Sequence, residues 1–320
     1  MSQDQTQGPS SATPSNGGNR PERVLLTGAS GQLGQALLAS CPDRINLIPV
    51  SRAELDLADA KACHDLVREL APDWVLNAGA YTAVDRAETE PDLARAVNAG
   101  APEAFAQALA TGSGRLLQVS TDFVFDGRQG HPYQPDQALA PLGVYGATKA
   151  QGEAAALRIL GASQASILRT SWVYGPVGRN FCLTMLRLHG QRAASGESLG
   201  VVADQVGCPT ATHSLAAACW AVIERRLSGT LHWSDCGAAS WYDFAVAIGE
   251  LGVEAGVLER AALVRPLTTA EYPTPARRPP YSLLETSSTR LALGLEPCHW
   301  RRALAQVLER LKALGTTLPR

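Results

Sequence analysis

The glycine-rich run after the first apolar segment constrains the fold of this chain most. Arg23 to Thr27 has the character of a short strand, the run Thr27-Gly-Ala-Ser-Gly-Gln-Leu-Gly34 follows, and a helical pattern begins at Gln32. Glycines let a backbone turn tightly against a pyrophosphate, and a helix N-terminus offers unpaired N–H groups to it. A glycine-rich loop alone is often only a tight turn. Between a strand and a helix, this one predicts a dinucleotide-binding site.

Apolar segments of strand length alternate with helical patterns through the first half of the chain. The expected strands and helices are, in order, 23–27, a helix from 32, 45–50, 58–70, 74–77, 92–110, 115–120, 145–160 and 166–170. This order predicts an α/β fold with a Rossmann-type, doubly wound parallel sheet covered by helices on both faces.

The pattern loosens after about residue 175. Short strands are expected at 199–202, 230–233 and 264–266, and helices near 212–226, 240–251 and 300–314. We therefore predict three parts: a disordered tail (1–21), an NAD(P)-binding domain (22–175), and a smaller, mainly substrate-binding C-terminal portion (176–320). The boundary at 175 is soft, because such folds often return a strand or helix to the first sheet.

Charge and composition argue against several classes of partner. The net charge is −2 and no long basic block is present, so neither nucleic acid nor an anionic membrane surface is expected to bind. The first twenty residues are too polar for a core or a secretory signal, and no apolar stretch reaches membrane-spanning length. The seven cysteines are odd in number and lack a C-x-x-C pair, which indicates neither disulfides nor zinc and fits a cytoplasmic protein.

The cofactor is expected at the ends of the first four strands. The residues expected to contact it are Gly28, Ser30, Gly31, Gln32, Leu33, Gly34, Ser51, Arg52, Asp56, Leu57, Ala78, Gly79, Ala80, Tyr81, Val119, Tyr145 and Lys149. After the second strand, Ser51-Arg52 stands where a carboxylate would bind a ribose 2′-OH, and no acid follows until Glu54. Because arginine tolerates a 2′-phosphate, this favours NADPH over NADH, unless Arg52 is only a solvated surface charge.

Tyr145 and Lys149 lie four residues apart and share one face of an expected helix. A phenol titrates near pH 10, and a nearby cation lowers its pKa, which makes the tyrosine a proton donor for a carbonyl under reduction. Such a pair also occurs by chance on many helix surfaces.

A polar triplet, Ser120-Thr121-Asp122, ends the fourth strand at the edge where open α/β sheets bind ligands. The Thr121 hydroxyl could donate a hydrogen bond to a carbonyl oxygen as it gains charge, and Asp122 could orient Thr121 or a sugar hydroxyl. The alternative is a local helix cap or Asx turn.

These features together resemble the extended short-chain dehydrogenase/reductase superfamily. Within it, the chain resembles the dTDP-4-dehydrorhamnose reductase family, and the resemblance runs from about Arg23 to the last expected helix. It rests on the glycine loop, Thr121 and the Tyr145/Lys149 pair, and on the runs that start at Asn77 (NAGAYTAVDRAE), Ser120 (STDFVFDG), Arg169 (RTSWVY), Asp204 (DQVGCPT) and Tyr272 (YPTPARRP).

The resemblance implies reduction of the C4 ketone of dTDP-4-dehydro-β-L-rhamnose by NADPH or NADH, the last step of dTDP-L-rhamnose synthesis. Tyr145 would be the general acid, Lys149 would lower its pKa and hold the nicotinamide ribose, and Thr121 would assist the developing alkoxide. The substrate is expected to contact Thr121, Asp122, Phe123, Tyr145 and Trp172, with Asn180, Arg277 and Arg278 near its diphosphate. Trp172 could equally be ordinary core packing.

Two departures from the family pattern concern metal binding and one aromatic position. Some members dimerise around magnesium held by glutamates, but Ala36 and His213 stand at the matching places. We therefore expect no metal site, and either a monomer or a homodimer. Phe123 replaces a more usual tyrosine, which keeps the ring and loses the hydroxyl.

Two other functions are compatible with the same scaffold. A nucleotide-sugar dehydratase or epimerase is one, although a 4,6-dehydratase needs an acid where Phe123 stands. The other is a non-catalytic binding role like that of the regulatory subunit of methionine adenosyltransferase, since fold alone does not decide function. The intact set of Thr121, Tyr145 and Lys149 argues against it.

Overall fold

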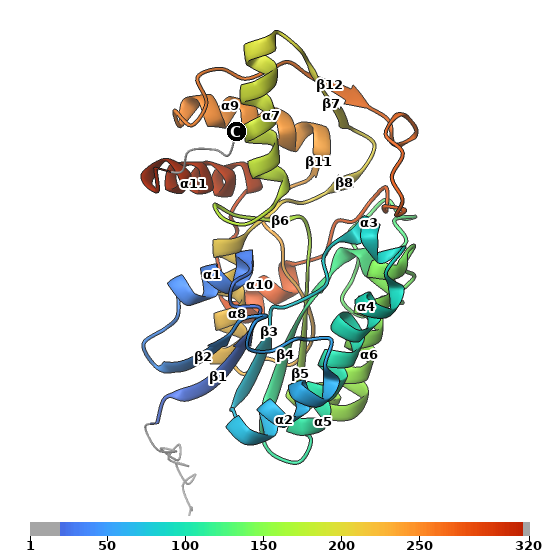
Figure 1. Ribbon diagram of the computed structural model, residues 1–320, viewed down its shortest axis with the longest axis vertical. Helices are drawn as coiled ribbons and strands as arrows, with labels where there is room; N and C mark the ends of the chain where they lie inside the picture. The colour runs from blue at the N-terminus through green and yellow to red at the C-terminus, as the bar shows by residue number, and fades with distance from the viewer. Residues whose placement is uncertain (1–19, 316–320) are drawn as a thin grey trace, which may run out of the picture.

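The structure, a computed structural model that describes residues 20–315, is built around a six-stranded sheet (Figure 1). All its strand pairs are parallel, and the order is β2-β1-β3-β4-β5-β10. The strands are β1 (Glu22–Thr27), β2 (Ile45–Val50), β3 (Trp74–Asn77), β4 (Arg115–Thr121), β5 (Ala165–Thr170) and β10 (Gly229–His232). The predicted α/β parallel sheet is therefore confirmed, and its order reverses between β1 and β3.

Helices cover both faces of the sheet, which explains why its strands are apolar on both sides. One face packs on α2 (Ala60–Leu70), α5 (Ala101–Leu109) and α6 (Val144–Gln164). The other packs on α1 (Gln32–Ala39), α8 (Thr212–Glu224) and α10 (Ser287–Leu293). Successive residues alternate between the two cores: Leu25 faces α5 and α6, whereas Leu26 faces α8.

The single helix expected over 92–110 is three consecutive segments. These are α4 (Pro91–Arg95), a π-helical turn (Ala96–Gly100) and α5, and a short helix α3 (Val84–Ala87) precedes them. Helix α6 extends beyond its predicted end, and Gly161, with a φ of 66°, interrupts its regular geometry.

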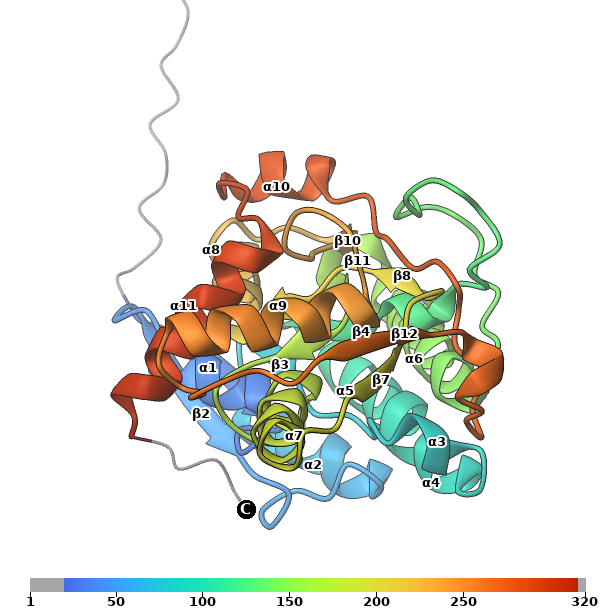
Figure 2. The ribbon, with the colours of Figure 1, turned by 90° about the horizontal axis from the view of Figure 1, so that it is seen from above.

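The C-terminal portion has a core of its own, above the sheet in the view of Figure 1. Its main helices are α7 (Phe181–Ser195), α9 (Trp241–Glu254) and α11 (Trp300–Ala313). Its short strands are β6 (Val173–Tyr174), β7 (Leu199–Val202), β8 (Val206–Gly207), β9 (Thr210–Ala211), β11 (Ala239–Ser240) and β12 (Val264–Leu267). Viewed from above, α7, α9 and α11 lie over the sheet layer (Figure 2). Helix α7 was not expected, although its buried residues follow helical spacing at 182, 185, 186 and 189.

Three elements that follow residue 175 in the chain belong to the sheet layer, namely β10, α8 and α10. The two-part division at residue 175 stays a proposal, with these elements on the cofactor side. The predicted tail lies outside the described residues, except that Arg20 forms an ion pair with Asp73 at 2.6 Å. Within residues 20–315, no helix has the length and apolar character needed to cross a membrane.

Gly34, in the first turn of α1, allows this helix to pack against the loop before it. A Cβ at this position would overlap the carbonyl oxygens of Gly28 and Ala29, which are backbone atoms that cannot rotate away. At Gly31, by contrast, the nearest atom to a Cβ is the Gly28 oxygen at 3.1 Å.

We predict that Gly34→Ala lowers the free energy of unfolding by about 2–3 kcal/mol, the cost of overpacking a closed contact. Gly31→Ala, the control from the same loop, should cost about 1 kcal/mol or less. Urea denaturation followed by tryptophan fluorescence measures both. Equal losses in the two variants would contradict this account of α1 packing.

Candidate active site

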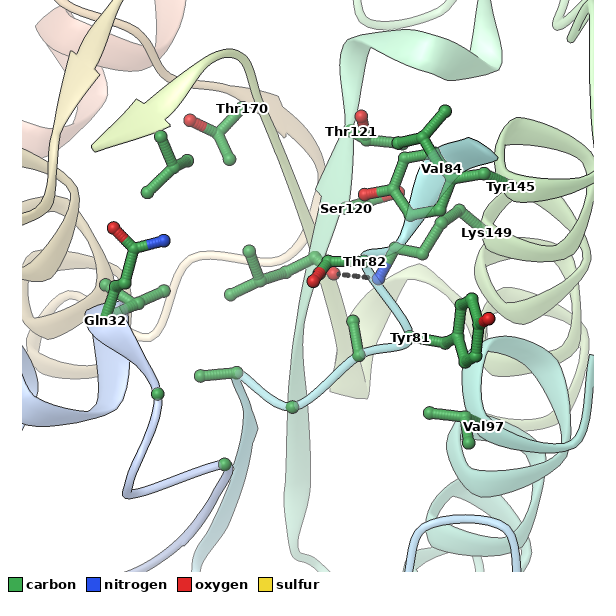
Figure 3. Close-up of a pocket in the computed structure, with 18 of the residues that line it drawn as sticks. Gln32, Tyr81, Thr82, Val84, Val97, Ser120, Thr121, Tyr145, Lys149 and Thr170 are labelled. Carbon is green, nitrogen blue, oxygen red and sulfur yellow. Dashed lines mark hydrogen bonds between the residues drawn. The ribbon is translucent and has the colours of Figure 1, made fainter. Parts of the chain in front are cut away.

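A cavity of about 740 Å³ opens at the carboxyl ends of the sheet strands, a size and place typical of ligand sites in open α/β folds. Most residues selected from the sequence line it. They are Gly28, Ser30, Gly31, Gln32, Leu33, Arg52, Asp56, Leu57, Ala78, Gly79, Ala80, Tyr81, Val119, Thr121, Asp122, Phe123, Tyr145, Lys149, Trp172 and Arg278. In Figure 3, Tyr145, Lys149, Ser120 and Thr121 lie together on one side, and Gln32 lies across from them.

Four selected residues do not line the cavity: Gly34, Ser51, Asn180 and Arg277. Gly34 packs against the loop before α1, and Arg277 is exposed to solvent. The Ser51 backbone N–H donates to Glu54 Oε2 at 2.7 Å, which closes a turn after β2.

Asn180 acts as the N-terminal cap of α7, so its amide is already committed. Its Oδ1 accepts from the Leu183 N–H at 2.9 Å. Its Nδ2 donates to Gln32 Oε1 at 2.8 Å and to the Gly175 carbonyl at 2.9 Å, which uses both of its N–H groups. Gln32 Nε2 in turn donates to the Arg179 carbonyl at 3.1 Å. Asn180 therefore joins the start of α7 to the glycine loop and leaves no free donor for a phosphate.

The glycine loop presents the N-terminus of α1 to the cavity. The helix begins at Gln32, and its N-cap residue Gly31 has no side chain to bond the first N–H groups. Gly28 has a φ of 67°, and a Cβ there would lie 2.7 Å from the Gly79 backbone. The unpaired N–H groups and the positive helix end suit a pyrophosphate.

Helix α6 positions Tyr145 and Lys149, and a carboxylate from a part of the chain far away in sequence caps its N-terminus. Its N-cap residue is a glycine, and the Val144 N–H donates to Glu88 Oε1 at 2.9 Å. Tyr145 packs edge-to-face on Phe123, with ring centroids 5.6 Å apart and planes at 75°. One turn later, the buried Lys149 Nζ donates to the Val119 carbonyl oxygen at 2.7 Å.

Burial controls the titration of both groups. It raises the pKa of Tyr145 to about 12, an effect that the Thr121 hydroxyl partly offsets and Asp122 reinforces. It lowers the pKa of Lys149 to about 8, with Glu153 acting in the opposite direction. The predicted lowering of the tyrosine pKa by Lys149 is not present, because burial dominates and the ammonium group bonds the Val119 oxygen. The phenol is therefore protonated at neutral pH and can donate a proton.

Thr121 and Asp122 line the cavity, and Thr121 also caps the short helical turn that follows β4. Thr121 Oγ1 donates to Asp122 Oδ1 at 3.0 Å and accepts from the Phe123 N–H at 3.2 Å. Asp122 is 1% exposed, and among residues 20–315 its Oδ2 has no hydrogen-bond partner. Burial raises the pKa of this carboxyl to about 6.

Aromatic and basic side chains form the wall that the C-terminal portion contributes. Trp172 stacks on Trp241, with ring centroids 3.5 Å apart and planes at 5°. Arg278 forms an ion pair with Asp85 at 2.9 Å, which fastens the proline- and arginine-rich stretch to helix α3. Trp241 and Arg179 also line the cavity, and neither was among the residues predicted for the site. Trp241 follows the helix-capping residue Ser240, and that capping signal is readable from the sequence.

The two positions expected to lack metal ligands have other contacts. Ala36 packs into the core between α1 and α8, and His213 Nε2 lies 3.0 Å from Gln306 Oε1. Across the described part of the chain, no three His, Cys, Asp or Glu side chains come together as a metal site. Independence from magnesium stays a prediction.

Comparison with known proteins gives consistent matches along almost the whole described chain. The family model for the RmlD substrate binding domain matches residues 22–313. A dTDP-4-dehydrorhamnose reductase from Aggregatibacter actinomycetemcomitans is 39% identical over 293 residues, 89% of this chain and 98% of that protein. The Streptomyces griseus protein of the same name is 41% identical over 292 residues, 89% of this chain and 92% of its own.

A solved structure agrees with these matches. A crystal structure of dTDP-4-dehydrorhamnose reductase from Bacillus anthracis in complex with NADP superposes with a TM-score of 0.82 at 33% identity. The match covers 90% of this chain and 99% of that chain.

The depressed pKa of Lys149 predicts how cofactor binding depends on pH. A lysine is cationic below its pKa and neutral above it, so this residue loses its charge as the pH rises through about 8. We expect NADPH binding to weaken by about tenfold between pH 7 and pH 9, which follows from the fraction of protonated lysine. Fluorescence titration measures it. Lys149→Met should bind weakly with no such slope, and an unchanged slope would assign the titration to another group.

Proposed function

The chain belongs to the dTDP-4-dehydrorhamnose reductase family, and from this membership we propose that it reduces the C4 ketone of dTDP-4-dehydro-β-L-rhamnose to give dTDP-L-rhamnose. The observation that carries the proposal is that Thr121, Tyr145 and Lys149 share one cavity with the glycine loop and the N-terminus of α1. A binding subunit would have no need for a buried phenol and ammonium beside a dinucleotide site.

The proposed reaction divides between a hydride donor and a proton donor. A bound reduced nicotinamide supplies the hydride that C4 accepts. Tyr145 donates its phenolic proton to the carbonyl oxygen, which becomes the C4 hydroxyl. The Thr121 hydroxyl turns its proton from Asp122 Oδ1 to the same oxygen as the charge on that oxygen grows. Lys149, one turn from Tyr145, would hold the nicotinamide ribose, and solvent returns a proton to the phenolate that remains.

The residues after β2 favour NADPH over NADH. Arg52 lines the cavity, whereas the Glu54 carboxylate folds back onto the Ser51 N–H and is not directed at a ribose. A planar guanidinium suits the extra 2′-phosphate. The NADP that the Bacillus anthracis relative holds supports this choice.

We place the sugar between Tyr145 and the aromatic wall made by Trp172 and Trp241. Asp122 and Phe123 would contact the sugar, and Arg278 would lie nearest the diphosphate. Phe123 contributes its ring, which supports Tyr145, and has no proton to give. For that reason we favour reduction over the elimination of water that a 4,6-dehydratase performs.

Tyr145→Phe should reduce turnover of dTDP-4-dehydro-β-L-rhamnose with NADPH by about 100-fold or more, the usual contribution of a general acid. NADPH affinity should stay within about twofold, because only a proton donor is removed. Loss of absorbance at the nicotinamide band measures turnover. Tyr133→Phe, which removes a phenol bonded to Asp126 away from the cavity, is the matched control. A parallel loss of turnover and cofactor binding in Tyr145→Phe would make the tyrosine structural.

Arg52→Ala should weaken NADPH binding by about tenfold, because a hydrogen bond to a charged group typically contributes that much to affinity. NADH binding should stay unchanged. Arg44→Ala is the control: Arg44 precedes β2 at its opposite end and pairs with Glu224. Dissociation constants for both cofactors decide the outcome. Equal weakening of NADH and NADPH would place Arg52 on the shared part of the cofactor.

A further inference from the structure

A buried ion pair lies directly behind the cavity and has no role in the reaction as described so far. Arg169, on β5, donates from Nη2 to Glu153 Oε2 at 2.7 Å and from Nε to both carboxylate oxygens at 3.1 Å. The two side chains are only 5% and 2% exposed. Taking two charges out of water is expensive, and a pair of apolar residues would often be at least as stable. Such a pair calls for a reason other than stability.

Glu153 connects this pair to the reacting side chains. It follows Lys149 by four residues on α6, so Tyr145, Lys149 and Glu153 form one stripe along the helix. The Ser120 hydroxyl, which lines the cavity next to Thr121, donates its hydrogen bond to Glu153 Oε1. One carboxylate therefore contacts the cavity wall and lies one turn from the lysine.

Arg169 is itself fixed from three other directions. Its Nη1 donates to the Pro135 carbonyl at 3.0 Å and lies 3.2 Å from His232 Nε2, and its guanidinium carbon lies 5.3 Å from the Phe125 ring centroid. Burial and the neighbouring Arg169 lower the pKa of His232 to about 3, so this ring is neutral and accepts from the guanidinium. Arg169 is a rigid clamp for the Glu153 carboxylate.

We propose that Glu153, clamped by Arg169, is a positioning residue of the reaction: its buried negative charge acts on Lys149 one turn away, and its Oε1 fixes the Ser120 hydroxyl at the cavity wall. The proposal rests on the reductase function inferred above and adds to its active residues a pair, Glu153 and Arg169, that lies behind the cavity.

The charges around Lys149 show why a fixed anion matters. The titratable groups near it are Tyr145 and Glu153 on α6, Asp122 after β4, Tyr81 after β3 and, behind Glu153, Arg169 on β5. Burial lowers the pKa of Lys149, and Glu153 is the carboxylate that opposes this effect. Because Arg169 and Ser120 hold the carboxylate, it favours the cationic lysine through space and leaves the ammonium free of a direct ion pair.

The test is the pH profile of kcat/KM. If Glu153 had a purely structural role, its removal would leave the alkaline midpoint of this profile unchanged. In Glu153→Gln, the alkaline midpoint should fall by about one pH unit, the size expected when a nearby opposite charge is removed. The double variant Glu153→Met/Arg169→Met should shift it the same way without leaving any buried charge unpaired. Glu103→Gln is the matched control. Glu103 also pairs with an arginine, Arg158 of α6, at 2.8 Å, but this pair lies at the exposed surface.

The outcomes separate this inference from the proposed function. A lowered midpoint in both Glu153 variants, with Glu103→Gln at the wild-type value, supports it. A wild-type midpoint in a folded double variant, whatever its rate, overturns it and makes the pair structural. If wild-type protein does not oxidise NADPH with dTDP-4-dehydro-β-L-rhamnose, the proposed function fails. The same midpoints are then read from NADPH binding, where an unchanged slope overturns the inference independently.

Discussion

The close approach of two backbone segments, at Gly28 and Gly79, determines the rest of the site. A Cβ on Gly28 would lie 2.7 Å from both the Gly79 nitrogen and Cα, and the φ of 67° at Gly28 already disfavours any side chain. The contact joins the ends of β1 and β3, where the strand order reverses and open sheets bind ligands. With no side chain between them, the first N–H groups of α1 reach the floor of the cavity.

The C-terminal portion is tied to this floor by polar contacts from both sides of the cavity. On one side, Gln32 of α1 bonds Asn180 at the start of α7. On the other, Asp85 pairs with Arg278 and also accepts from the Ala276 N–H at 3.2 Å. Because both contacts begin in the first turns of the helices that follow β1 and β3, the sheet sets where the aromatic wall stands relative to Tyr145.

Sequence could predict what depends on local pattern, and it missed what depends on packing. Short apolar runs indicate strands, so β2, β3 and β7 were located to the residue, and the parallel sheet was predicted correctly. The resemblance placed Asn180 near the diphosphate, but the contacts of this side chain depend on α7, whose helical spacing was overlooked. The pKa of Tyr145 was expected to fall because the Lys149 ammonium lies four residues away. Burial, which no spacing reveals, raises it.

The Trp172 backbone shows that the fold itself fixes part of the aromatic cavity wall. Its φ of 48° lies in the left-handed region, which costs a bulky residue on the order of 1–3 kcal/mol. The indole stacks on Trp241, which holds the Trp172 backbone in this conformation. Gly207 leaves room for the indole, because a Cβ at that position would lie 2.6 Å from it. Since surrounding structure over-determines this conformation, the indole plane is set by the fold, and a sugar would meet a surface that needs little reordering on binding.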